Sequence, residues 1–467
     1  MILPTVAFLL VSLLIGTYAS RRIKGSVRNY FVAGNVIPFW VLVFSMTGQA
    51  IELGATHDNA NLAVTAGFWD GAVLPIGVGC SLILIGFFFA QPLHRLRLLT
   101  LPDYYVQRYS PSVGVVVALV CTVSFTILIA GNLAGLGMLL QIGLGVPPHI
   151  SVPAVALLIM VYTMAGGLFA VTWNDILQIG VSIVAFTVGL VWIVVHLEPG
   201  ELQRALSSKV SLAPLTDFSG GALRLWASLL ALALGDIVAL DFMERVFATG
   251  SAGSARSSCI VAGVMAIVIG VALAILGTIA ASSMNASDGN VLSYIQHHLP
   301  AGLSMLFIMG FIGAGLSTVD GAVMACSVCL SRNVLQVCAP TVVTEGRLLS
   351  VARCMAVPVT AVGVLLALVF PVPAELLVLA FDVVFAGCLV PLALGIYWSR
   401  GTPRAAFLAI VIPSALRVTL HYAFADLWAN PQINGLQTLI PPVFSLLIFL
   451  SVTWYDERRL LLVEKTA

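Results

Sequence analysis

The sequence predicts an all-α polytopic membrane protein with 13 transmembrane helices. Of its 467 residues, 60% are hydrophobic and only 9% are charged, whereas soluble domains carry about 25% charged residues. Apolar runs of about 20 residues recur along the whole chain, and each could cross a bilayer core of ~30 Å. Lys and Arg cluster in alternate connections between these runs. This composition excludes an ordinary soluble enzyme, and nothing in it indicates nucleic-acid binding.

The apolar runs end at Gly, Pro and charge clusters, which set the boundaries of the predicted spans. The first run has no basic residue ahead of it and no cleavage site, so we expect a retained helix. No soluble domain interrupts the chain, and one transmembrane domain over 1–467 is expected. The expected spans are 3–20, 37–63, 70–93, 112–145, 151–172, 174–197, 221–248, 257–283, 300–331, 348–371, 373–398, 404–424 and 435–455.

The distribution of basic residues predicts the orientation. An odd number of spans puts the termini on opposite sides, and an external N-terminus makes the segments near 21–36, 94–111, 244–256, 332–347 and 399–404 and the C-terminal tail cytoplasmic. These segments and the adjoining Arg353 hold all but four of the 21 Lys and Arg residues. Cytoplasmic loops of membrane proteins carry such an excess. The four exceptions are Arg204, Lys209, Arg224 and Arg417.

Two adjacent hydroxyl residues, Ser317 and Thr318, lie inside an apolar helix in the stretch FIGAGLSTVDGA. Ala314 lies on the same helix face, because residues three and four apart are neighbours. That face offers two hydroxyl oxygens and a backbone carbonyl, and hard cations take oxygen ligands. The small residues around it would let another helix bring further carbonyls close. The pattern indicates a sodium site, and therefore an ion-driven transporter.

Polar residues enter the second half of span 37–63, where Gln49, Glu52 and Thr56 follow an apolar stretch. A continuous lipid-facing helix would not carry these side chains, because buried charge is costly in a bilayer. A helix broken near Gly48–Glu52, lining a cavity, accounts for them. The alternative is that residues 54–62, with His57 and Asp58, already form an outer loop.

Span 221–248 has a related interruption at Gly235 and Asp236. Residues 37–197 and 221–398 each hold five expected spans, and a five-helix repeat inserts with opposite topology in its second copy. Paired broken helices at the start of inverted repeats are typical of a central binding site near the midplane. We expect the solute contacts to come from Gln49, Glu52, Thr56, Asp236 and Asp241.

Other polar residues favour structural roles. Asp175 and Glu244 are expected to form ion pairs or helix caps. Asp320 points away from the hydroxyl face and is expected to pair with a neighbouring helix or to attract a cation. Asn132 lies among small residues, which indicates close helix packing. No nucleophile–base set or metal-ligand cluster is found in the sequence, so no enzyme activity is expected.

Four segments of the chain resemble motifs of the sodium:solute symporter family, in order and at the expected spacing. The resemblance implies a LeuT-type fold, an inverted five-helix repeat with one extra helix before it and two after it. It also implies a sodium site formed by carbonyls of Gly48 and Ile51 together with Ala314, Ser317 and Thr318. The segments are NYFVAGN (29–35), YTMAGGLFAVTWNDILQ (162–178), DFMERVFATGSAGSAR (241–256) and GLSTVDGAVMACSVCLSRN (315–333).

The chain departs from the family pattern at three positions. Asn35 stands where arginine is common, and Glu244 where glutamine is usual. Glu52 replaces what is often a small or hydroxyl residue, and an acid there could bind an amine, sense a proton or add charge beside sodium. The solute therefore cannot be taken over from a known member.

We expect a sodium-coupled secondary active symporter that imports a small polar organic solute by alternating access, with Na⁺ as coupling ion. Carboxylates without a midplane Lys or Arg favour a neutral, zwitterionic or cationic solute. The expected setting is the lipid bilayer of a bacterial inner (plasma) membrane, with a cytoplasmic C-terminus and no obligatory protein partner. The alternatives are a proton-coupled symporter in which Glu52 titrates, and a transport-inactive membrane sensor.

Overall fold

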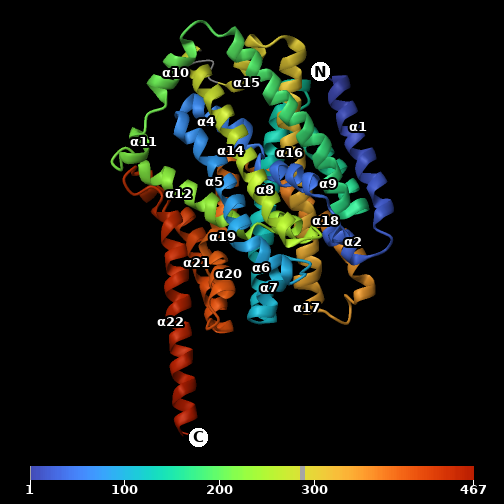
Figure 1. Ribbon diagram of the computed structural model, residues 1–467, viewed down its shortest axis with the longest axis vertical. Helices are drawn as coiled ribbons and strands as arrows, with labels where there is room; N and C mark the ends of the chain where they lie inside the picture. The colour runs from blue at the N-terminus through green and yellow to red at the C-terminus, as the bar shows by residue number, and fades with distance from the viewer. Residues whose placement is uncertain (1, 284–289, 467) are drawn as a thin grey trace.

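The structure, a computed structural model, describes residues 2–283 and 290–466 as a bundle of helices (Figure 1). No β-strand forms in this part of the chain. Many of the long helices run roughly along the vertical axis of Figure 1, and the C-terminal helix extends well below the rest. The all-helical architecture predicted from composition is confirmed.

The N-terminal half consists of one peripheral helix, the helices that carry the next five predicted spans, and several short helices. They are α1 (Ile2–Ala19), η1 (Ser20–Arg22), α2 (Val27–Val32), η2 (Ala33–Asn35), α3 (Phe39–Ala50), η3 (Gly54–Asp58), α4 (Asn59–Thr65), α5 (Phe68–Leu84), η4 (Ile85–Phe89), α6 (Ala90–Arg95), α7 (Leu101–Arg108), α8 (Pro111–Leu144), α9 (Pro148–His196), α10 (Glu201–Lys209) and α11 (Ala213–Thr216).

The C-terminal half begins with a second interrupted helix and ends with two helices that pack on each other. Its elements are α12 (Ala222–Gly235), η5 (Asp236–Val238), α13 (Leu240–Ala248), α14 (Ala252–Ser283), α15 (Val291–His298), α16 (Ala301–Cys329), η6 (Leu330–Leu335), α17 (Gln336–Cys338), α18 (Glu345–Val369), α19 (Pro373–Gly387), α20 (Leu389–Tyr397), α21 (Pro403–Ala423), η7 (Ala425–Ala429) and α22 (Leu436–Thr466).

Nine helices of the described chain are long and apolar enough to cross a membrane, and the number rises to eleven if each bent pair counts as one span. The bent pairs are α12–η5 with α13, at 45°, and α19 with α20, at 43°. α3 is shorter and apolar, and η3 and α4 follow it after a break. An integral membrane protein is therefore confirmed, while the number thirteen stays a prediction.

The predicted spans 151–172 and 174–197 form one element, α9, and the break lies at Gly167 rather than near residue 173. A straight helix of 49 residues would be about 74 Å long, far beyond a ~30 Å core. Gly167 has φ 53° and ψ −146°, a conformation that glycine tolerates and other residues avoid. A Cβ there would also lie 2.6 Å from the carbonyl oxygen of Tyr30. Two constraints thus require glycine at this turn.

Both predicted helix breaks are present. α3 ends at Ala50, and Ile51 leaves the helical region with φ −96° and ψ 34° before the π-helical turn η3. α12 ends at Gly235, and Ala239 is extended, with φ −61° and ψ 124°, before α13 begins. The alternative of an outer loop at 54–62 is wrong, because these residues are helical and mostly buried.

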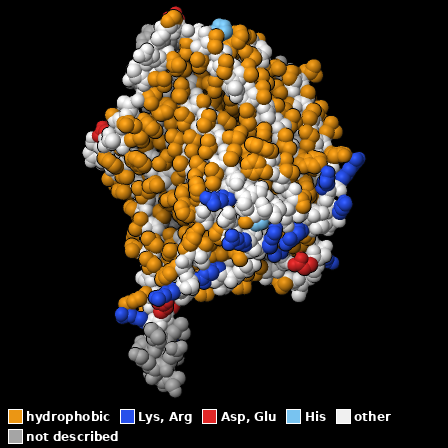
Figure 2. All heavy atoms as spheres, viewed as in Figure 1, with side chains coloured by type: hydrophobic (Ala, Val, Ile, Leu, Met, Phe, Trp, Pro, Cys, Tyr) orange, Lys and Arg blue, Asp and Glu red, His pale blue; other side chains and the backbone are white. Residues whose placement is uncertain are grey.

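α22 continues past the predicted end at residue 455 as far as Thr466. The chain after 455 is rich in charged residues, and the helix continues through them without a break. Hydrophobic side chains cover most of the face in Figure 2, and the Lys and Arg side chains gather in its lower part. This separation agrees with a membrane-embedded body that has one strongly basic end.

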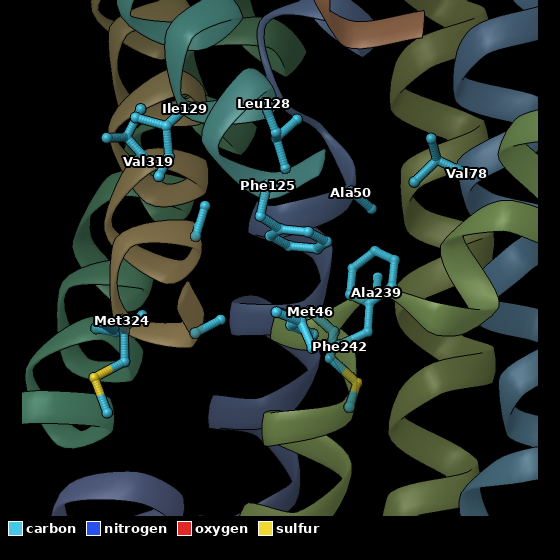
Figure 3. Packing of buried hydrophobic residues seen from close by; sticks show 14 of the residues in the cluster. Met46, Ala50, Val78, Phe125, Leu128, Ile129, Ala239, Phe242, Val319 and Met324 are labelled. Carbon is cyan, nitrogen blue, oxygen red and sulfur yellow. The ribbon is translucent and has the colours of Figure 1, made fainter. Parts of the chain in front are cut away.

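Apolar packing surrounds the break of α3. Phe125 of α8, Met46 of α3 and Phe242 of α13 gather between their three helices (Figure 3), and all three are buried. Lipid provides little hydrophobic driving force between helices, so close side-chain packing of this kind holds them together. It also fixes the two interrupted helices relative to α8.

Candidate functional site

The interrupted end of α3 exposes backbone groups inside the protein, and a side chain of α8 binds one of them. The N–H of Leu53 donates to Oδ1 of Asn132 at 3.1 Å. Nδ2 of Asn132 donates to the Glu52 carboxylate at 3.0 Å and to the carbonyl of Leu128. Buried backbone groups freed by a helix break need such partners. Asn132 therefore holds both the break and the acid beside it, a role that the packing interpretation missed.

Thr56 completes the turn after the break. Its hydroxyl donates to the carbonyl of Glu52 at 2.8 Å, and the side chain is fully buried. Beyond it, Nδ1 of His57 lies 2.8 Å from the carboxylate of Asp58, and the His57 ring meets Phe311 edge-on. The Phe311 contact anchors η3 against α16, while the other two contacts are local.

α3 and α16 approach closely at the predicted sodium site. A Cβ on Gly48 would lie 2.4 Å from Oγ of Ser317, so only glycine permits this approach. The Gln49 carboxamide donates to the carbonyl of Ser317, and Oε1 of Gln49 has no donor among the described residues. The structure thus brings the region of residues 48–51 against the hydroxyl face of α16.

The hydroxyls of that face donate their protons elsewhere. Oγ of Ser317 donates to Oδ1 of Asp175 at 2.7 Å. Oγ1 of Thr318 donates to the carbonyl of Ala314 at 3.2 Å. Oγ of Ser317 also accepts from Nε2 of Gln49 at 3.4 Å, which leaves one lone pair on it for a cation. The hydroxyl oxygen of Thr318 keeps its lone pairs as well, and both side chains are buried. Oxygen donors of this type suit a hard cation.

A buried ion pair lies directly behind Ser317. Nη2 of Arg245 lies 3.1 Å from Oδ2 of Asp175, and neither side chain is exposed. Nε of Arg245 donates to Oγ of Ser45 at 2.7 Å, and the Ser45 hydroxyl also donates to the Asp175 carboxylate. The ion-pair role predicted for Asp175 is confirmed.

The assignment of Arg245 to a cytoplasmic loop is wrong. The residue lies in α13, and its guanidinium is buried because the Asp175 carboxylate neutralises it. A signal was present in the sequence, since Arg245 falls inside the predicted span 221–248. A charge within a span needs a partner. Ser45 has no sequence signal of its own, because an isolated serine in an apolar helix is unremarkable.

The second interrupted helix carries two of the predicted solute residues. Asp236 is 1% exposed, and neither of its carboxylate oxygens has a hydrogen-bond donor among the described residues. Asp241 is more fully bonded, because Oδ1 accepts from the N–H of Phe242, and its carbonyl accepts from Arg245. Of these two acids, Asp236 is therefore the one whose carboxylate lacks hydrogen-bond donors among the described residues.

Both breaks pack against α19. A Cβ on Gly54 would lie 2.3 Å from Cδ1 of Leu377, and one on Gly235 would lie 2.9 Å from the carbonyl oxygen of Phe381. One helix therefore contacts the chain immediately beside Glu52 and beside Asp236. On α16, Asp320 accepts from the hydroxyl of Tyr162 at 2.7 Å, which confirms its pairing with a neighbouring helix.

Comparison with known sequences shows that this chain is similar to transporters. The sodium:solute symporter family matches residues 30–412. A high-affinity choline transporter from Homo sapiens is 25% identical over 72% of this chain, and the aligned region spans 62% of that protein. A sodium/glucose cotransporter from Vibrio parahaemolyticus is 28% identical over 35% of this chain and 31% of its own length.

Two solved transporters share the fold. A Na⁺-coupled sialic acid symporter in a substrate-bound outward-open state superposes with a TM-score of 0.80, at 17% identity and 96% coverage of both chains. A nucleobase-cation-symport-1 family transporter in a closed conformation gives a TM-score of 0.53, at 16% identity, with 92% of this chain and 95% of that chain covered. Both are LeuT-fold transporters, which supports the predicted fold class.

Proposed function

Because the chain belongs to the sodium:solute symporter family, we propose that it couples sodium movement to transport of a small cationic or zwitterionic organic solute. Members of this family are transporters rather than enzymes. The coupling ion is Na⁺. Solute and ion cross by alternating access, around a site between the interrupted helices.

The sodium site in this proposal consists of the carbonyls of Gly48 and Ile51 with Ala314, Ser317 and Thr318. Support comes from the contact of Gly48 with the Ser317 hydroxyl and from the two proton-donating hydroxyls of α16. An ion held there would join α3 to α16. By linkage, it would favour whichever access state contains the intact site.

The solute proposal depends mainly on the charge balance of the interior. Glu52 and Asp236 are buried, and the buried Lys and Arg side chains of the described chain are Arg245 and Arg417. Each of these arginines is paired, with Asp175 and with Asp382 respectively. A buried carboxylate without a partner is costly. A positively charged solute group would supply the missing partner.

Gln49, Thr56 and Asp241 complete the proposed solute site. Oε1 of Gln49 is a free acceptor beside the sodium site. Thr56 and Asp241 are engaged in local backbone bonds, so they shape the two breaks. The similarity to choline transporters agrees with a cationic solute.

Uptake into proteoliposomes tests the proposal. With an inward sodium gradient we expect accumulation of radiolabelled choline or glycine betaine, and none of glucose or sialic acid. A proton gradient without sodium should drive no uptake. Accumulation of the neutral or anionic probe alone would refute the solute class, and equal uptake with a proton gradient would refute sodium coupling.

Comparison of the variants D236N and D426N tests whether Asp236 binds the positively charged group of the solute. Asp236 is buried without a hydrogen-bond donor, whereas Asp426 is exposed on η7. D236N should weaken binding of the cationic probe about tenfold or more, the scale of one charged hydrogen bond, while D426N should not. Unchanged affinity in D236N would remove Asp236 from the site.

A further inference from the structure

We propose that a groove between α1 and the second half of α9 binds one anionic phospholipid. Its acyl chain would lie along the groove, and its phosphate would contact Arg21 and Arg22. This site is separate from the central site and does not depend on the identity of the solute.

The groove is apolar and large enough for a lipid chain. Its volume is about 700 Å³, and a second cavity of about 610 Å³ adjoins it at the end of α1. The two cavities share Ile15 and Trp173. Ligand sites in proteins span roughly 300–1,000 Å³. The larger cavity is lined by side chains that include Ile15, Trp173, Ile176, Val184 and Leu306.

The depth of the groove matches one leaflet of a bilayer. Along α9 it extends from Trp173 to Val184, which is about 17 Å at 1.5 Å per residue. Half of a ~30 Å hydrocarbon core is about 15 Å. An acyl chain that starts at the level of Trp173 would therefore end near the bilayer midplane.

The polar end of the groove carries two arginines and two aromatic rings. The Arg21 guanidinium lies 4.8 Å from the ring centre of Tyr18, and that of Arg22 lies 5.4 Å from the ring centre of Trp173. Trp and Tyr favour the headgroup level of a membrane. Both arginines are exposed, and neither has a carboxylate within 4.0 Å in the described chain. A lipid phosphate would complement them.

The charge also decides between a lipid and a second copy of the chain. In a dimer formed through α1 in one membrane, the symmetry axis would stand along the membrane normal. It would place equal residues at equal depth. Arg21 and Arg22 would then face their own counterparts, which is unfavourable. An anionic headgroup, by contrast, gains from both positive charges.

Gly180 offers a way to close the groove without disturbing the fold. It lines the groove, and a Cβ added there meets no atom within 4 Å. In G180L the new side chain would occupy the space of the acyl chain. Gly302 of α16 is equally open but lies outside the groove lining. G302L is therefore the matched control, because it adds the same side chain at an open position outside the groove.

Native mass spectrometry of the full-length protein, titrated with phosphatidylglycerol or phosphatidylcholine, tests the proposal. We expect each chain to bind one phosphatidylglycerol tightly and to bind phosphatidylcholine more weakly. R21Q/R22Q should lower the affinity for phosphatidylglycerol about thirtyfold, because two surface charges are lost. G180L should remove the tight site, while G302L retains it. R458Q, which removes an arginine over Trp454 on α22, should also retain it.

Three results would overturn the proposal. The first is equal binding of the two lipids by the wild-type protein. The second is an unchanged tight site in both R21Q/R22Q and G180L. The third is a dimer that G180L converts to monomers, because a second copy would then fill the groove. Thermal unfolding of each variant without added lipid checks that the fold is retained.

Discussion

At the scale of single residues, Ser317 is held by contacts with three other residues. Its hydroxyl donates to Asp175, its carbonyl accepts from Gln49, and its Oγ lies against Gly48. Each of these contacts comes from a different position on α3 or α9. The sequence could predict the face formed by Ala314, Ser317 and Thr318 from helical spacing. It could not predict that Asp175, far away in the chain, would orient the hydroxyl.

Removing both hydroxyls tests the sodium site. S317A/T318A should raise the sodium concentration needed for half-maximal uptake by about tenfold or more, because each lost charged contact is worth roughly 1.5–3 kcal/mol. Sodium-dependent uptake measures this. S327A on the same helix is the control, since among the described residues the Ser327 hydroxyl bonds only the carbonyl of Met324. An unchanged sodium requirement in the double variant would contradict the site.

Glu52 can be tested without changing its shape. In E52Q the side-chain oxygen can still accept from Asn132, so the break of α3 should stay intact. The negative charge is lost, and affinity for a cationic solute should fall about tenfold. Isothermal titration calorimetry with the transported probe measures this affinity. E345Q, at the exposed start of α18, is the control. Equal affinities in E52Q and wild type would leave the acid without a solute role.

At the scale of elements, the two interrupted helices were predictable and their partners were not. Polar residues after an apolar half, as at Gln49 and Asp236, indicate a break because lipid cannot satisfy them. The turn in α9 was predicted near residue 173 and lies at Gly167, because the position depends on the approach of Tyr30 and on the positive φ of Gly167, which local sequence does not show. The role of Asn132 depends on the register of α8 against α3, which local sequence does not encode.

Loss of one partner of the buried ion pair between α9 and α13 should lower the stability of the protein strongly. R245M leaves Asp175 uncompensated, which costs about 3–5 kcal/mol in comparable buried pairs. The thermal unfolding midpoint in detergent should therefore drop sharply. D175N/R245M should recover part of the loss, because no unpaired charge remains.

The exposed pair of Arg404 and Asp456, at 3.3 Å, supplies the comparison. Surface pairs are worth about 0–1 kcal/mol, so R404M should shift the midpoint little. If R245M were as stable as R404M, the interior pair would have no structural role.

At the scale of the whole molecule, the fold class followed from composition and the LeuT-type architecture from the family resemblance. The count of thirteen spans, the division into repeats 37–197 and 221–398, and the orientation stay predictions. The basic end seen in Figure 2 is where the positive-inside rule places the cytoplasm. Asp382, by contrast, pairs with Arg417 and Thr438 inside the C-terminal helices, so it fastens α19 to α21 and α22.

Native cysteines test the orientation. Cys338 and Cys354 are exposed, on α17 and α18. In C354A, an impermeant maleimide should label Cys338 only after the cytoplasmic side is opened, and C338A/C354A should lose this label. L212C in that double variant places a thiol at an exposed outer position, and it should react in intact cells. Labelling of Cys338 in intact cells would invert the topology.

The hydroxyl of Ser317 has a consequence for signalling between the two halves of the chain. A cation that draws electron density from its oxygen makes the O–H a stronger donor to Asp175. That carboxylate is shared with Arg245 on α13 and Ser45 on α3. Ion occupancy would thus redistribute charge along a relay that ends on both interrupted helices. Through the Ser317 oxygen, ion binding would then affect α3 and α13, the segments that must move.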